Sequence, residues 1–231
     1  MTASNLTAPA PLSTLTTPTA RAALLVLGPV VTVAARLLSV PWNDAGTSGA
    51  TEVVQGFSDH PARADLGGTL VMVGGVLLVL TIWVLAAHVA DSKARTAFVC
   101  GVLMLCGASS IIARGAMSLS TGQLVRHAPH DAAVTVVAHL TVDTLAIDAL
   151  GLLGALGWLV LGVTLYRRRL VPRTTAVLLG LGGFTSMFTA GGPIRVLVVG
   201  SALVLLAGTV RVATDMLRGD HQRRVSPRVG A

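Results

Sequence analysis

The sequence predicts an all-α integral membrane bundle of six transmembrane helices, with both termini in the cytoplasm. The first observation behind this fold class is a succession of six long apolar blocks. Most of them are near the ~20 residues with which a helix crosses ~30 Å of hydrocarbon, at about 1.5 Å per residue. The blocks are Ala22–Val40, Gly67–Val89, Ala97–Leu119, Asp143–Tyr166, Thr174–Ala190 and Ile194–Ala213.

Composition is the second observation. Of the 231 residues, 53% are hydrophobic and only 12% are charged, whereas soluble domains carry about 25% charged residues. Too little polar surface remains to cover such a core in water, so a lipid bilayer is the expected partner. Because lipid offers no hydrogen bonds, each segment must satisfy its own backbone N–H and C=O groups, which favours helices over strands.

The distribution of positive charge is the third observation. Twelve of the seventeen basic residues fall on one side of the predicted spans, and the positive-inside rule places that side in the cytoplasm. The chain is therefore predicted to be a multi-pass protein of the plasma membrane. The same distribution accounts for the net charge of +7, so we exclude a nucleic-acid partner. The cytoplasmic set is Arg21, Lys93, Arg95, Arg167, Arg168, Arg169, Arg173, Arg211, Arg218, Arg223, Arg224 and Arg228.

The two ends of the chain differ from its middle. Residues 1–21 are mostly Thr, Ala, Pro and Ser and offer little to bury, so a disordered cytoplasmic tail is expected. Residues 22–213 form the transmembrane domain, and residues 214–231 form a basic cytoplasmic tail. Pro29 should kink the first helix because its ring removes a backbone hydrogen bond. Alternatively, the first block is a cleaved signal peptide, which would leave five spans.

The connections between blocks define the outer side. The longest is Pro41–Leu66, within which Thr51–Phe57 is expected to form a short surface helix. The stretch Ala132–Tyr166 would reach ~50 Å as one helix, so the span should begin near Asp143 and the residues before it should extend outward or lie on the outer surface. A very short turn, Gly191–Pro193, makes the last two helices antiparallel neighbours.

Charged side chains inside the spans gather near the outer ends of four helices. An isolated charge costs ~2.5–3.5 kcal/mol at mid-bilayer, so pairing between the carboxylates and the guanidinium groups is expected. Asp148 is the deeper acid and should face the bundle interior with Arg114. His139 precedes Asp143 by four residues and shares its face if the helix extends outward. The predicted ligand-binding set is Arg36, Arg114, His139, Asp143, Asp148 and Arg195.

This outer polar set is compatible with three functional classes. The leading hypothesis is binding or transport of a small molecule, ion or lipid, in which the acids supply negative charge or proton coupling and the arginines hold an anionic group. A membrane-embedded enzyme would instead use Asp143 or Asp148 as its catalytic general acid or base. A non-catalytic membrane subunit would need neither. The same charges also fit structural ion pairs between helices, or arginines that reach the headgroups.

The outer loops contain a second pattern of polar residues. His127 and His130 form an H-x-x-H pair followed directly by Asp131, and imidazole and carboxylate groups are ligands that zinc accepts. The pair is not the H-E-x-x-H of a metalloprotease helix, and solvated loop histidines are expected. No metal or other cofactor is therefore predicted. The sequence also lacks a phosphate-binding loop and a nucleophile elbow.

Several features together resemble a known kind of protein. They are an outer loop with Asp59-His60-Pro61, the span Gly67–Val89, a short charged inner turn, and a glycine-containing third span. In this layout the chain resembles the uncharacterised small polytopic membrane proteins of high-GC bacteria, and the resemblance implies a multi-pass fold without an established activity.

The chain is also similar in size to small membrane-bound terpene cyclases, which use intramembrane carboxylates. Such sites are expected to line carbocations with aromatic rings. Only 3% of the residues here are aromatic, and the sequence departs from the cyclase pattern in this respect.

Overall fold

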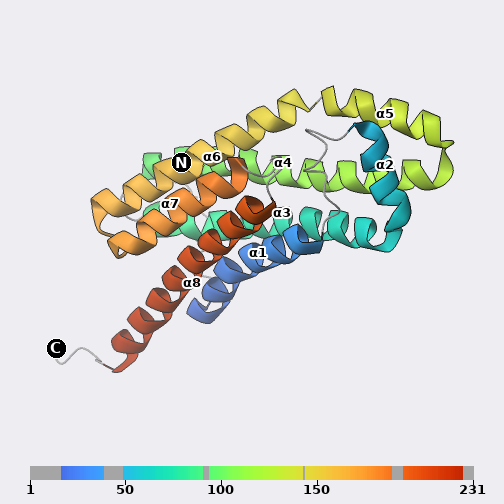
Figure 1. The fold of residues 1–231 in the computed structure, drawn as a ribbon. Coiled ribbons are helices and arrows are strands. Elements are labelled where there is room, and N and C mark those ends of the chain that lie inside the picture. Colours follow the sequence, from blue (N-terminus) through green and yellow to red (C-terminus); the bar gives the residue numbers. More distant parts are fainter. Residues whose placement is uncertain (1–16, 39–48, 91–93, 143, 189–194, 226–231) are drawn as a thin grey trace, which may run out of the picture.

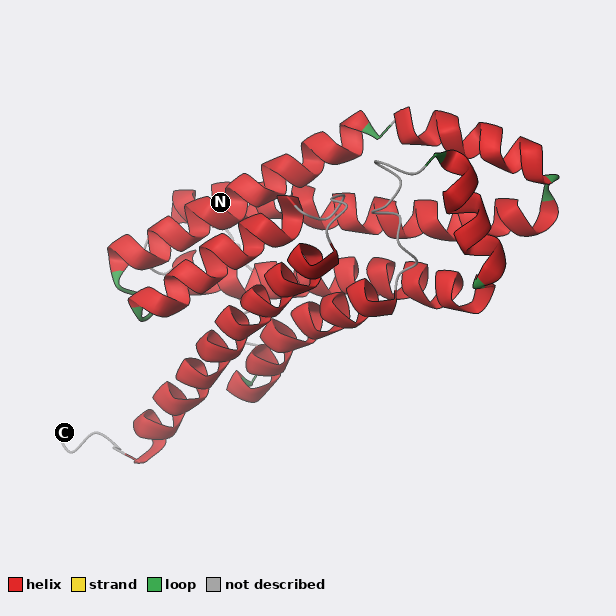
Figure 2. Cartoon of the chain, viewed as in Figure 1, coloured by secondary structure: helices red, strands yellow, loops and turns green. Residues whose placement is uncertain are grey.

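A computed structural model describes residues 17–38, 49–90, 94–142, 144–188 and 195–225, and every regular element in these ranges is a helix (Figures 1 and 2). The predicted tail 1–21 and the turn Gly191–Pro193 lie largely outside these residues. The helices are α1 (Pro18–Leu38), α2 (Ala50–Asp59), α3 (Pro61–Ala90), α4 (Ala94–His127), α5 (His130–Val142), α6 (Leu145–Arg168), α7 (Arg173–Phe188) and α8 (Arg195–Val225).

Six of these helices close into a ring. Along the ring α1 packs on α3, α3 on α4, α4 on α6, α6 on α7 and α7 on α8, and α8 returns to α1 (Figure 1). Each predicted apolar block corresponds to one of the six. The ring encloses a core in which Trp158, Leu78 and Leu179 are fully buried, while many large apolar side chains remain on the outside, as lipid-facing helices require.

Five of the ring helices are long and apolar enough to cross a membrane: α1, α3, α4, α6 and the Val196–Arg218 part of α8. The chain therefore has the features of a membrane protein. The remaining helix, α7, has 16 described residues, which correspond to only about 24 Å of helix. It is packed between α6 and α8.

Helices α3 and α4 extend beyond the predicted apolar blocks. Helix α3 begins at Pro61 rather than Gly67, and α4 continues to His127 rather than ending at Leu119. Helix α2, close to where a short surface helix was predicted, and α5 pack over these projecting ends (Figure 1). A small separate core that includes Val54, Phe57, Ala133 and Val137 holds them together. We call this assembly of α2, α5 and the projecting ends the cap, and the adjoining end of the ring the cap end.

The ring helices approach one another closely where glycines face each other. A Cβ atom built on Gly154 of α6 would lie 2.3 Å from the Cα atom of Gly107 in α4, and one built on Gly162 of α6 would lie 2.6 Å from the Cα atom of Gly180 in α7. No side chain fits at such distances, so backbone packs directly on backbone at both crossings. Small residues serve this role in membrane helix pairs.

Helix α5 and helix α6 are separate. Helix α5 ends at Val142 and α6 begins at Leu145, so a single continuous helix does not carry His139 into the span. Asp143 lies outside the described residues, so the prediction that His139 and Asp143 share one helix face stays a prediction.

Candidate functional site

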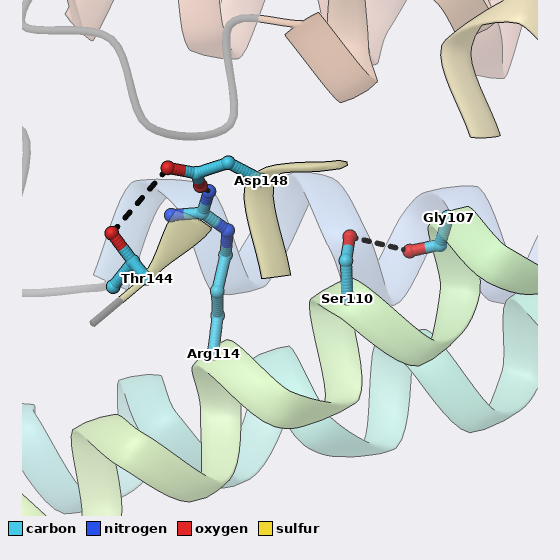
Figure 3. A network of polar contacts seen from close by, with 5 residues as sticks. All are labelled: Gly107, Ser110, Arg114, Thr144 and Asp148. Carbon is cyan, nitrogen blue, oxygen red and sulfur yellow. Dashed lines mark hydrogen bonds and ion pairs between the residues drawn. The ribbon is translucent and has the colours of Figure 1, made fainter. Parts of the chain in front are cut away.

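An ion pair joins α4 to α6 at the cap end of the ring. The Nη2 atom of Arg114 donates to Oδ1 of Asp148. The other carboxylate oxygen, Oδ2, accepts from the hydroxyl of Thr144, 3.4 Å away and just before the start of α6 (Figure 3). The predicted outer-end carboxylate and guanidinium thus lie together.

The glycine crossing places this pair. Helices α4 and α6 are antiparallel, and Gly107 contacts Gly154 where they cross. Closer to the cap end, Ser110 lies beside Gly151, where a Cβ atom on the glycine would lie 3.4 Å from the serine Oγ. Ser110 donates to the carbonyl of Gly107 at 2.8 Å, so its hydroxyl is satisfied within its own helix (Figure 3). Arg114 follows one helical turn further along α4, and Asp148 lies at the matching level of α6.

Arg36 brings a third charge from α1. Its side chain is partly buried near the end of that helix. Arg36 lies in the last turn of α1, and Arg63 contacts the end of that helix from the cap end of the ring. Two positive groups and one carboxylate from three helices therefore occupy the same end of the ring. We call Arg36, Arg114, Thr144 and Asp148 the polar cluster.

Asp148 is less enclosed than the sequence suggested. Its side chain is 50% exposed and that of Arg114 is 28% exposed, whereas Asp148 was predicted to face the bundle interior. The reason is its position in the first turn of α6, beyond which no further turn of that helix covers it. A carboxylate is favourable there because it faces the positive end of the helix dipole.

Other predicted site residues lie elsewhere. His139 belongs to α5 in the cap, and its Nδ1 atom is 2.8 Å from the carbonyl oxygen of Thr135 in the same helix. Asp143 and the side chain of Arg195 lie outside the described residues. His127, His130 and Asp131 sit where α4 gives way to α5. Within the described ranges, no three His, Cys, Asp or Glu side chains come together as a metal site.

Comparison with known proteins adds a family. The family model described as a domain of unknown function, DUF4386, matches residues 21–217. The chain belongs to the DUF4386 family. No curated protein and no solved structure matches it. The matched residues run from α1 into α8, so the unit that defines the family contains both the ring and the cap.

The DUF4386 protein has two further polar contacts at the cap end that the sequence did not reveal. Arg126 of α4 binds Asp65 of α3 through two parallel contacts, Nη1 to Oδ2 at 2.6 Å and Nη2 to Oδ1 at 2.8 Å. Arg63 donates to the carbonyls of Leu37 and Leu38 at 3.3 and 3.1 Å. It thereby satisfies backbone acceptors that the end of α1 leaves open.

The signal for these contacts was present but ambiguous. Arg63 and Asp65 lie in the predicted connection Pro41–Leu66, and Arg126 follows the apolar block Ala97–Leu119, because hydropathy ends a span where the apolar residues end. Only because α3 and α4 continue past the predicted apolar blocks do Asp65 and Arg126 face each other across two adjacent helices. Their pair belongs to the cap, and it offers a matched comparison for the Arg114–Asp148 pair.

Proposed function

We propose that this DUF4386 protein is a six-span plasma-membrane protein, with both termini in the cytoplasm, that binds or moves a small molecule, ion or lipid through the polar cluster. In this orientation the cluster and the cap face outward. Helix α7 (Arg173–Phe188) would be the sixth span. The twelve basic residues on the opposite side support the orientation through the positive-inside rule.

The observation that carries the proposal is the half-exposed Asp148 carboxylate, held by Arg114, with a second arginine, Arg36, at the same end of the ring. Charges in a bilayer normally line a functional pathway or face a water-filled space. Asp148 accepts a single hydrogen bond from Arg114, through Oδ1, whereas a phosphate or carboxylate group of a ligand could accept two from the same guanidinium. Such a ligand would compete with Asp148 for Arg114 and would bring negative charge to the end of the ring where Arg36 also lies.

Asp148 would then couple the binding of an anionic ligand to the binding of a proton or a cation. When an anionic group binds Arg114, the released carboxylate of Asp148 can accept a proton or a cation. Movement of the anionic ligand would thereby be coupled to movement of that proton or cation. Asp143, two residues before α6, and Arg195, the first residue of α8, would extend the set of charges available to the ligand.

Native mass spectrometry of the purified chain tests binding. The wild-type protein should retain a non-covalent adduct, and Arg114→Gln and Asp148→Asn should each lose it while remaining folded. Arg126→Gln, which breaks the comparable pair in the cap, should keep the adduct. If the outer pair is merely structural, all three variants will carry the same adduct or none.

Once the adduct is identified, proteoliposomes distinguish binding from movement. Transport requires that Asp148→Asn abolish flux of that compound. Turnover of the compound by purified protein without any gradient would instead identify an enzyme and contradict the proposal.

A further inference from the structure

The opposite end of the ring carries a fixed group of arginines. The Cζ atom of Arg173, the first residue of α7, lies 5.6 Å from the centre of the Tyr166 ring in α6. Arg211 of α8 donates through Nη1 to the hydroxyl of Thr174 in α7 at 3.0 Å. Helices α6, α7 and α8 therefore contribute to one surface. Arg173 and Arg211 are both exposed there, and the guanidinium group of each is oriented by one contact, with Tyr166 and with Thr174 respectively.

Arg169, in the turn between α6 and α7, has an unusual backbone conformation. It ends α6 in the left-handed region, with φ of 52°, and is the only non-glycine residue with positive φ among those described. Glycine is the usual residue at such a helix end, because a Cβ atom disfavours this conformation. An arginine at this position is less stable in the left-handed conformation than glycine would be, and it places a positive charge in the turn between α6 and α7.

Apolar side chains continue from these arginines into the membrane region. On α7, Val177 and Leu181 follow Thr174 at the i+3 and i+7 positions, and they are 47% and 52% exposed. On α8, Ala207 and Val204 precede Arg211 by four and seven residues, and both are exposed. Because α7 and α8 are packed neighbours and Arg211 reaches Thr174, the two apolar rows start from the same point.

We propose that this surface binds an anionic phospholipid. The phosphate would lie between Arg173 and Arg211, where arginine forks match its oxygens, and an acyl chain would lie over Val177 and Leu181. Tyr166 fits the interfacial position that this ring commonly takes. A free phosphate ion would use the same guanidinium groups, but it would have no use for the apolar rows. The site is at the other end of the ring from the polar cluster and does not depend on the function proposed for that cluster.

The test is a native mass spectrometry titration of the full chain in detergent with phosphatidylglycerol and, separately, with phosphatidylcholine. We expect at least tenfold tighter binding of phosphatidylglycerol by the wild type. Arg173→Gln/Arg211→Gln should lose most of that preference. The control Arg95→Gln/Arg218→Gln removes the same charge from exposed positions at the same end and should keep it.

Four results would overturn the proposal. One is no preference in the wild type, and another is an equal loss in both double variants, which would indicate diffuse attraction. The third is binding of inorganic phosphate alone with the affinity of the lipid. If the glutamine variant does not fold, Arg173→Lys/Arg211→Lys keeps the charge but not the forked geometry. We expect it to weaken phosphatidylglycerol binding at least threefold, and wild-type affinity would be the fourth contrary result.

Discussion

The position of the polar cluster depends on the glycine crossing of α4 and α6, and Gly154→Ala tests that dependence. The added Cβ atom would lie 2.3 Å from the Cα and 2.7 Å from the N atom of Gly107. Both are backbone atoms, so neither can rotate away. The helices must separate by about 1 Å, since ordinary contact begins near 3.4 Å. Overpacking of this kind costs ~1–3 kcal/mol.

That cost should appear as a fall in Tm of roughly 2–4 °C for each kcal/mol in a chain of this size. Thermal unfolding of the purified protein in detergent measures it. Gly151→Ala is the matched control, one turn away on the same helix, because its Cβ atom would meet the Ser110 Oγ at an ordinary 3.4 Å. Alanine also favours helix over glycine by ~1 kcal/mol, so this control should be neutral or stabilising. Equal Tm values for the two variants would refute the close backbone contact.

Substitutions at three other residues test separate parts of the fold by the same thermal unfolding assay. Arg126→Gln should cost no more than ~1 kcal/mol, because both partners of the pair with Asp65 are more than a third exposed; a larger loss would make this pair essential to the cap. The Trp158 Nε1 atom is buried and has no hydrogen-bond partner among the described residues, so Trp158→Phe should change stability by less than ~1 kcal/mol while Trp158→Ala should cost ~3–5 kcal/mol. Similar losses in both would show that the N–H is satisfied. Arg169→Gly should stabilise the chain by up to ~1 kcal/mol, because glycine accepts the positive φ; a lower Tm would contradict the assigned strain.

Much of the ring could be predicted because it follows from solvation alone. Each apolar block corresponds to a helix, since a chain in lipid must pair its backbone within each segment. The ends of α3 and α4 could not be predicted in the same way. Hydropathy reports where the apolar residues stop, whereas Pro61–Leu66 and Ser120–His127 continue the helices and pack against α2 and α5.

The charged residues of the polar cluster were predicted from the sequence, whereas Thr144 and the geometry of the cluster were not. The placement of Arg114 and Asp148 near the same ends of two spans follows from counting residues, and their separation in sequence says nothing about contact. The contact depends on which helices are neighbours and on the register that Gly107 and Gly154 impose. Likewise, the exposure of Asp148 depends on α6 beginning only at Leu145, and the apolar pattern around Asp143 does not mark that start.

The central claim is that the polar cluster is open to water on the outer side of the membrane. Labelling of an Asp148→Cys variant with a membrane-impermeant maleimide in intact cells tests it most directly, after the native Cys100 and Cys106 are replaced by alanine. The account predicts that Cys at this position reacts without permeabilisation, whereas an Arg169→Cys variant, at the opposite end, reacts only after permeabilisation. A folded Asp148→Cys protein that stays unreactive in intact cells would contradict the claim.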